Sequence, residues 1–238
     1  MAQNSEFNET NTMNKKLTQS YAILNFYRQL RPDLHLEEGV AIMNPFADEQ
    51  AWQLAEAFYH KFYNDTHPRR FIFGINPGRF GAGVTGVPFT DPIRLKEVCG
   101  IDNDLPRKAE LSSLFIYAMI EAYGGARAFY HDFYITALSP LGFTKNGVNL
   151  NYYDDKSLMK SIEPFMVDCI RQQQKTITTT DICFCLGEGT NYKIFQKLNE
   201  RYGFFKQITP LPHPRWIMQY RRKKVDEFVQ LYVEKLKA

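Results

Sequence analysis

The sequence predicts a three-layer α/β/α fold, in which helices cover both faces of a central, mainly parallel sheet of four strands. Two observations lead to this prediction. Short apolar runs that end in turn residues alternate with longer segments of helical periodicity. The 238 residues, 44% of them hydrophobic, also suffice for one large domain with a complete core. Ligands of such folds bind at the carboxyl ends of the strands, so functional residues are expected in the loops that follow them.

The expected elements can be placed in chain order. Residues 1–14 are polar and have no apolar period, so we expect a disordered tail, followed by a single domain over residues 15–238. Strands are predicted at 69–75, 131–139, 181–187 and 205–211. Helices are predicted over 15–30, 47–64 (N-cap Asp48), 109–125 (closed by Gly124), 155–175 (kinked at Pro164), 190–203 (capped by Thr190, ended by Gly203) and 225–236.

Composition narrows the class of protein. A net charge of +3 permits a polyanionic partner without requiring one. The polar start of the chain does not resemble a signal peptide, and no apolar run approaches the roughly 18 residues of a membrane helix. Four cysteines without paired spacing indicate free thiols in the cytoplasm and no bound metal. An iron–sulfur cluster is the alternative, disfavoured by the apolar surroundings of Cys183 and Cys185.

The loop after the first predicted strand carries the clearest signal for a functional site. The segment "FIFGINPGRFGAGVTGVPF", residues 71–89, places Asn76 where the apolar run ends and the glycines begin. Neither a Walker loop nor the dinucleotide fingerprint is present. A surface turn, whose glycines supply positive φ and whose asparagine bonds its own backbone, is the structural alternative.

The fuller pattern of this loop is specific. Gly74, Asn76-Pro77-Gly78, Phe80-Gly81 and Thr85-Gly86-Val87-Pro88-Phe89 resemble the first motif of the uracil-DNA glycosylase superfamily, and most closely its single-strand-selective monofunctional (SMUG-type) branch. "LPHPRW", residues 211–216, resembles the second motif, although His-Pro pairs are common. The resemblance covers about residues 60–225.

This resemblance implies a DNA glycosylase that hydrolyses the N-glycosidic bond of deaminated bases in DNA, uracil first and also hypoxanthine or xanthine, and so starts base excision repair. The base leaves as an anion, so the site must hold a water and stabilise negative charge. Asn76 is implied to orient the water, Phe89 to stack on the extruded base, and His213 to donate a hydrogen bond to it. The alternative for Phe89 is a side chain of the hydrophobic core, and the alternative for His213 is a loop histidine with no catalytic role.

The same resemblance assigns further residues. Gly74, Ile75, Gly78 and Phe80 are implied to surround the base. No matching lysine is available for a Schiff base, which implies base removal without strand cleavage. No cofactor is implied, and the expected protein is a monomer whose partner is DNA and not a membrane.

Two positions depart from the SMUG-type pattern. Ala137 stands where the branch carries an asparagine that reads the base. Ser139, two residues on and on the same side of an extended chain, is a candidate substitute, and a serine that begins a turn before Pro140 is the alternative.

The second departure is a shortened loop after His213, where the chain runs directly into Pro214, Arg215 and Trp216. Either Arg215 or Trp216 is suited to fill the stack that an extruded base leaves. Phosphate contacts are predicted for basic residues, with a solvated charged face as the alternative. They are Arg69, Arg70 and Arg79 around the first motif and the basic run Arg221, Arg222, Lys223 and Lys224.

Two other classes of function remain open. Ala137 is compatible with a non-catalytic module that binds nucleic acid or a nucleotide on the same fold. A hydrolase of small nucleosides is the more distant alternative, and it would not need a basic rim.

Overall fold

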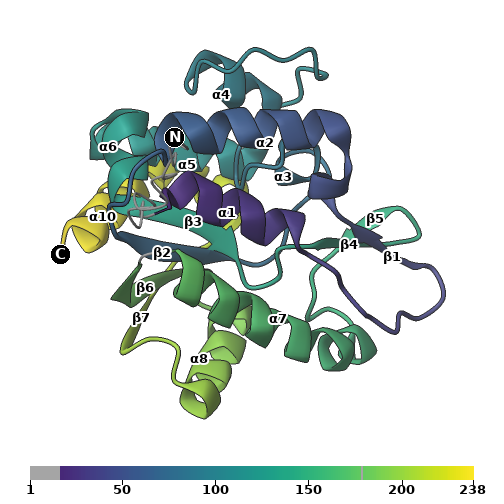
Figure 1. The fold of residues 1–238 in the computed structure, drawn as a ribbon. Coiled ribbons are helices and arrows are strands. Elements are labelled where there is room, and N and C mark those ends of the chain that lie inside the picture. Colours follow the sequence, from purple (N-terminus) through teal and green to yellow (C-terminus); the bar gives the residue numbers. More distant parts are fainter. Residues whose placement is uncertain (1–16, 178) are drawn as a thin grey trace, which may run out of the picture.

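Four parallel strands form the centre of the computed structural model, which describes residues 17–177 and 179–238 (Figure 1). Their order across the sheet is β3-β2-β6-β7, which confirms the predicted parallel sheet. The strands are β2 (Arg69–Gly74), β3 (Phe133–Ala137), β6 (Thr179–Leu186) and β7 (Gln207–Leu211). The predicted tail at 1–14 lies outside the described residues.

Helices cover both faces of this sheet, as predicted. Figure 1 shows α2, α5 and α6 on one side and α7 and α8 on the other, while α1 contacts both α2 and α7. The long helices are α1 (Gln19–Arg28), α2 (Glu49–Phe62), α5 (Leu111–Tyr123), α6 (Gly125–Asp132), α7 (Lys156–Thr176), α8 (Thr190–Tyr202) and α10 (Val225–Lys237). Within residues 17–177 and 179–238, no helix has the length and apolar character needed to cross a membrane.

Capping residues set most of the helix ends that the sequence predicts. Asp48 caps α2 by accepting a hydrogen bond from the amide of Ala51, and Gly124 ends α5. Gly203 ends α8 in the left-handed region, at φ 65°. Thr190 is wrong as the cap of α8, because it is the first helical residue and Gly189 takes the cap position.

A second, antiparallel sheet was not predicted. It consists of β1 (Val40–Met43), β4 (Gly142–Lys145) and β5 (Val148–Leu150), in the order β1-β4-β5. Because β4 begins five residues after β3 ends, this small sheet lies beside the carboxyl edge of the large one, as Figure 1 shows. The short helices α3 (Ala82–Thr85), α4 (Pro92–Glu97) and α9 (Pro214–Tyr220) were also missed.

Tyr152, just after β5, connects the two sheets. It is fully buried, and its hydroxyl donates a hydrogen bond of 2.8 Å to Oδ1 of Asn191. The amide of Asn191 in turn donates to the carbonyls of Gly74 and Leu186, which end β2 and β6. The backbone N–H of Tyr152 donates to Oδ1 of Asn76, at 3.1 Å. The carboxyl ends of two central strands are thereby fixed to the small sheet.

Replacing Tyr152 by phenylalanine tests this connection. The variant keeps the ring and the backbone N–H but leaves the buried Oδ1 of Asn191 without its donor, which typically costs about 1–3 kcal/mol. We therefore expect Tyr152→Phe to lower the free energy of unfolding by that amount in urea denaturation. Tyr220→Phe is the control, because Tyr220 is 65% exposed. Equal stability of the two variants would contradict the connection.

Candidate active site

Two adjoining hollows lie at the carboxyl edge of the large sheet, and Ile75 lines both. The smaller one, here called the cavity, is lined by Gly74, Ile75, Asn76, Pro77, Gly78, Ala82, Pro88, Phe89, Glu110, Thr136 and Ala137. The larger one, here called the groove, has a volume of about 810 Å³. Loops after β2, β5, β6 and β7 contribute to the groove, as expected for a parallel sheet.

The amide of Asn76 is held in one orientation by backbone groups. Nδ2 donates to the carbonyls of Pro77 and Leu150, both at 3.3 Å, and Oδ1 accepts from the N–H of Tyr152. An amide oxygen accepts two hydrogen bonds, so Oδ1 has one acceptor position left. Asn76 thus lines the cavity with a fixed amide and one free lone pair.

The ring of Phe89 packs closely against the backbone of Gly74, and the two residues form one wall of the cavity. A Cβ at position 74 would lie only 2.8 Å from Cε2 of Phe89, so the ring packs where only glycine leaves room. Phe89 itself has φ 54°, a left-handed conformation that is unusual for an aromatic residue. Such strain, of order 1–3 kcal/mol, is characteristic of functional sites. The ring lies in the wall of the cavity as a partly buried side chain.

His213 lines the groove, two residues after β7 and as the N-cap of α9. Its ring centroid is 6.4 Å from that of Phe89, and its Nδ1 accepts the N–H of Arg215 at 3.1 Å. Desolvation of the ring, and after it the positive charge of Arg215, lowers the pKa of His213 to about 4. The ring is therefore neutral at physiological pH, and because Nδ1 is an acceptor, its proton is on Nε2.

Ala137 and its candidate substitute, Ser139, have different surroundings. Ala137 lines the cavity as the last residue of β3 and offers no polar side chain there. Ser139 lines neither hollow; it is fully buried, and its hydroxyl donates to the carbonyl of Leu141 at 2.7 Å. The structure therefore gives Ser139 the turn role, and its hydroxyl is not placed to read a base.

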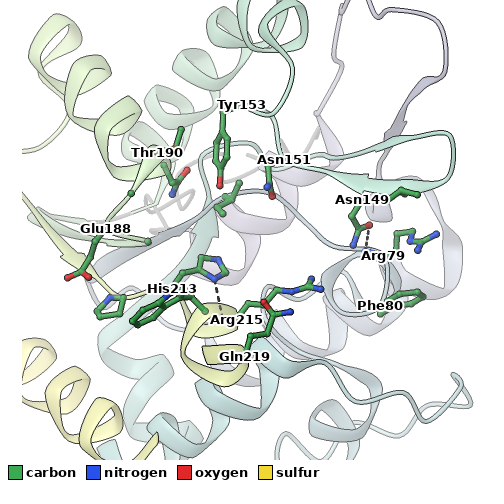
Figure 2. Close-up of a pocket in the computed structure, with 17 residues that line it drawn as sticks. Arg79, Phe80, Asn149, Asn151, Tyr153, Glu188, Thr190, His213, Arg215 and Gln219 are labelled. Carbon is green, nitrogen blue, oxygen red and sulfur yellow. Dashed lines mark hydrogen bonds between the residues drawn. The ribbon is translucent and has the colours of Figure 1, made fainter. Parts of the chain in front are cut away.

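The groove collects aromatic and basic side chains from several loops. Figure 2 shows Arg79 beside Asn149 on one side of the groove and Glu188 on the other, with Arg215 and Gln219 between them. Phe80 is 39% exposed, and both Arg79 and Lys108 lie over its ring. Phe80 thus belongs to the groove and not to the cavity.

Arg215 and Trp216 lie in the first turn of α9, after Pro214, and both line the groove. Trp216 is 40% exposed and packs edge-on against Phe228, while the guanidinium of Arg221 lies 4.8 Å from its ring. Arg221 and Arg222 are exposed but do not line the groove, and Pro214 is buried at the first turn of α9.

Two arginines that the sequence suggested as phosphate contacts have structural roles instead. Arg69 is fully buried, and it forms two hydrogen bonds to the carboxylate of Asp65 and one to the carbonyl of Tyr130. The guanidinium of Arg70 lies over the ring of Phe133. Both stand at the amino end of β2, opposite the cavity, so the prediction is wrong for Arg69 and Arg70.

Several lining residues were missed in the sequence. Val148 and Asn149 reach the groove from the β4–β5 hairpin, and Asn149 accepts the N–H of Arg79. The turn after β6 adds Glu188 and Thr190. Glu110, directly before α5, lines the cavity. The Asn-Gly pair at 146–147 signals a hairpin, whereas nothing in the sequence connects Glu110 with a loop thirty residues earlier.

One cluster of possible metal ligands occurs in the described part of the chain. The ligand atoms of His67, His131 and Asp132 lie within 4.8 Å of one another. The two imidazole rings are stacked, with centroids 4.0 Å apart and planes 22° apart, so their in-plane lone pairs do not converge on one ion. Asp132 is bound to His131 and Tyr123. The cluster also lies at the amino ends of β2 and β3, away from the cavity.

Comparisons with known proteins agree with this geometry. The family model of the uracil DNA glycosylase superfamily matches residues 60–237. A solved structure, wild-type SMUG2 of Pedobacter heparinus, is 47% identical, with a TM-score of 0.89 over 92% of this chain and 97% of the other. No curated protein sequence matches the chain. The chain belongs to the uracil-DNA glycosylase superfamily, as a SMUG-type member.

Proposed function

We propose that this DNA glycosylase extrudes deaminated bases from DNA and hydrolyses their N-glycosidic bond, with uracil as the main substrate and hypoxanthine and xanthine as further ones. One observation carries the proposal: Asn76 and Phe89 line the cavity, and His213, which lines the adjoining groove, has its ring centroid 6.4 Å from that of Phe89, although the two motifs lie more than 120 residues apart in the sequence. Removal of such a base starts base excision repair.

Asn76 acts on the water. Its free lone pair accepts a hydrogen bond from a water molecule, and its three bonds to backbone groups keep that lone pair fixed. A fixed acceptor lowers the cost of placing the water beneath the sugar carbon as the bond breaks. A strong base is not required, because the sugar approaches an oxocarbenium ion and accepts a weak nucleophile.

His213 acts on the leaving base. As a neutral ring with the proton on Nε2, it donates a hydrogen bond to the base oxygen on which negative charge develops. Loss of one such donor typically costs about 100- to 1,000-fold in rate. Phe89 holds the base by stacking, with its ring fixed against Gly74.

The groove binds the DNA strand. Arg79 and Arg215 supply positive charge for phosphates, and the exposed faces of Phe80 and Trp216 are suited to contact with bases. Base removal without strand cleavage is part of this proposal, because no lysine occupies a position of the motifs from which it could form a Schiff base with the sugar.

The decisive experiment uses labelled DNA with a single uracil, hypoxanthine or xanthine, followed by alkali to cleave abasic sites. We expect excision by the wild type and a loss of at least about 100-fold in Asn76→Ala, with DNA binding nearly unchanged, because the amide serves the transition state. Tight DNA binding by the wild type without any excision would instead indicate a non-catalytic module. Full activity of Asn76→Ala would mean that another group holds the water.

The protonation state of His213 is open to a direct measurement. Because its pKa is lowered to about 4, the ring should remain neutral with the proton on Nε2 as the pH falls from 8 to 5, and should become charged only near pH 4. Nitrogen-15 NMR of the histidine side chains measures this, and His213→Leu identifies the signal. A His213 signal that titrates above pH 6 would contradict a neutral donor.

The division of labour in residues 213–216 can be tested on different DNA substrates. Extruding a paired base costs a few kcal/mol, and an unpaired base costs less. His213→Leu should therefore slow single-stranded and duplex substrates by similar factors. Arg215→Ala and Trp216→Ala should lose about tenfold more on adenine–uracil pairs than on single strands, in single-turnover assays. Salt dependence should weaken mainly in Arg215→Ala. If Arg215→Ala and Trp216→Ala lost the same factor on all substrates, neither side chain would have a specific role in base extrusion.

A further inference from the structure

The cavity contains one polar side chain whose hydrogen-bonding groups are not used within the protein. The amide of Asn76 is bound to backbone groups, and the hydroxyl of Thr136 donates to Gln173 at 2.9 Å. Glu110 is the one titratable residue among the described residues that line the cavity, and no hydrogen bond to its carboxyl group occurs in the described part of the chain. This carboxyl group is therefore available to a ligand.

The backbone around Glu110 directs its side chain towards the motif loop. Glu110 precedes α5, and its own N–H is bound to Oδ2 of Asp91, but its carboxyl group does not cap the helix. A Cβ at position 78 would lie 4.0 Å from Oε1, and a Cβ at position 81 would overlap Oε2. The absence of a side chain at Gly81 thus makes room for the carboxyl group, which lies in ordinary contact distance of position 78.

The surroundings of Glu110 favour its neutral form. Burial raises the pKa of the carboxyl group; Arg215, from α9, opposes this effect, and Asp91, from the turn before α4, adds to it. Arg94 pairs with Asp91 and reduces the contribution of that charge. A flat base that fills the cavity removes further water from the carboxyl group, which shifts it again towards the neutral form.

A neutral carboxyl group matches the chemistry of a deaminated base. It offers one O–H donor and one C=O acceptor side by side. Deamination creates the complementary pair, an N–H next to a C=O, in uracil, hypoxanthine and xanthine alike. An ionised carboxylate would lose the donor and would repel the base as it leaves with negative charge.

We propose that Glu110 is a specificity-determining residue that binds the N–H and C=O edge of the extruded base through its neutral carboxyl group, and so supplies the polar contact that Ala137 does not offer. This inference rests on the proposed glycosylase function. It predicts that uracil, hypoxanthine and xanthine are all accepted in preference to cytosine and adenine, since the edge that Glu110 binds is common to the three deaminated bases and absent from their two parent bases cytosine and adenine.

The test compares single-turnover excision of uracil and xanthine from single-stranded DNA between pH 5.5 and 9. The wild type should slow as the pH rises and Glu110 ionises, with a limiting slope of tenfold per pH unit. Glu110→Gln keeps a donor and an acceptor without the titration, so its rate should match the wild type at low pH and exceed it at high pH. Glu110→Ala should be roughly 10- to 100-fold slower than Glu110→Gln at every pH.

Matched controls come from the same helix and from the motif loop. Glu121→Gln and Glu121→Ala alter an exposed carboxyl group at the far end of α5 and should behave as the wild type. Gly81→Ala should push the carboxyl group out of place and slow excision, and in the Glu110→Ala background it should cause no further loss. Circular dichroism and urea denaturation of each variant separate this effect from misfolding.

The outcomes distinguish the inference from the function on which it rests. A wild type that excises no base overturns the glycosylase proposal. An active wild type whose pH profile is unchanged in Glu110→Gln, or a Glu110→Ala variant that is as fast as Glu110→Gln, overturns the role of Glu110 alone. Additive losses from Gly81→Ala and Glu110→Ala would place the effect of Gly81 elsewhere in the loop.

Discussion

The hydrogen bonds between Tyr152, Asn76 and Asn191 are the constraint on which the rest of the site depends. The parallel sheet brings several loops to one edge, but a glycine-rich loop alone would not hold an asparagine at a fixed angle. Tyr152 supplies that rigidity from the small sheet, through its backbone N–H to Asn76 and its hydroxyl to Asn191. The second sheet therefore serves as the support of the first motif, which explains why it packs beside the carboxyl ends of the strands.

A second constraint acts on the opposite wall of the cavity. Phe89 holds a left-handed backbone conformation, and its ring fills the space that a side chain at Gly74 would need. The glycine is the last residue of β2, so the position of the ring is set directly by the central strand. Strain at Phe89 is compensated by packing of the surrounding loop. Under the proposed function, a stacking ring fixed in this way loses little conformational freedom when a base binds, which favours binding.

The sequence predicts the helices and strands that have a clear hydrophobic pattern. It does not predict contacts between side chains of elements that are distant in the sequence. The four central strands, Asp48 and Gly203 follow from local patterns. The strands of the small sheet have three or four residues and show no period, although the Asn-Gly turn marks their hairpin. Arg69 has the composition of a surface residue but is buried by its bonds to Asp65 and Tyr130, which no local pattern indicates.

The motif residues could be predicted from the sequence because the chemistry of the site restricts their type. Their protonation states could not be predicted in this way. Asn76 is a neutral amide, His213 is kept neutral by desolvation and by the nearby Arg215, and burial favours the neutral form of Glu110. The positive charges of Arg79 and Arg215 lie instead in the groove. Under the proposed function, phosphates thus meet charge at the groove, while the base meets side chains whose neutral form is favoured. Because the hydrogen bond from a neutral donor strengthens as negative charge develops on its partner, the proposed arrangement favours the transition state over the bound substrate.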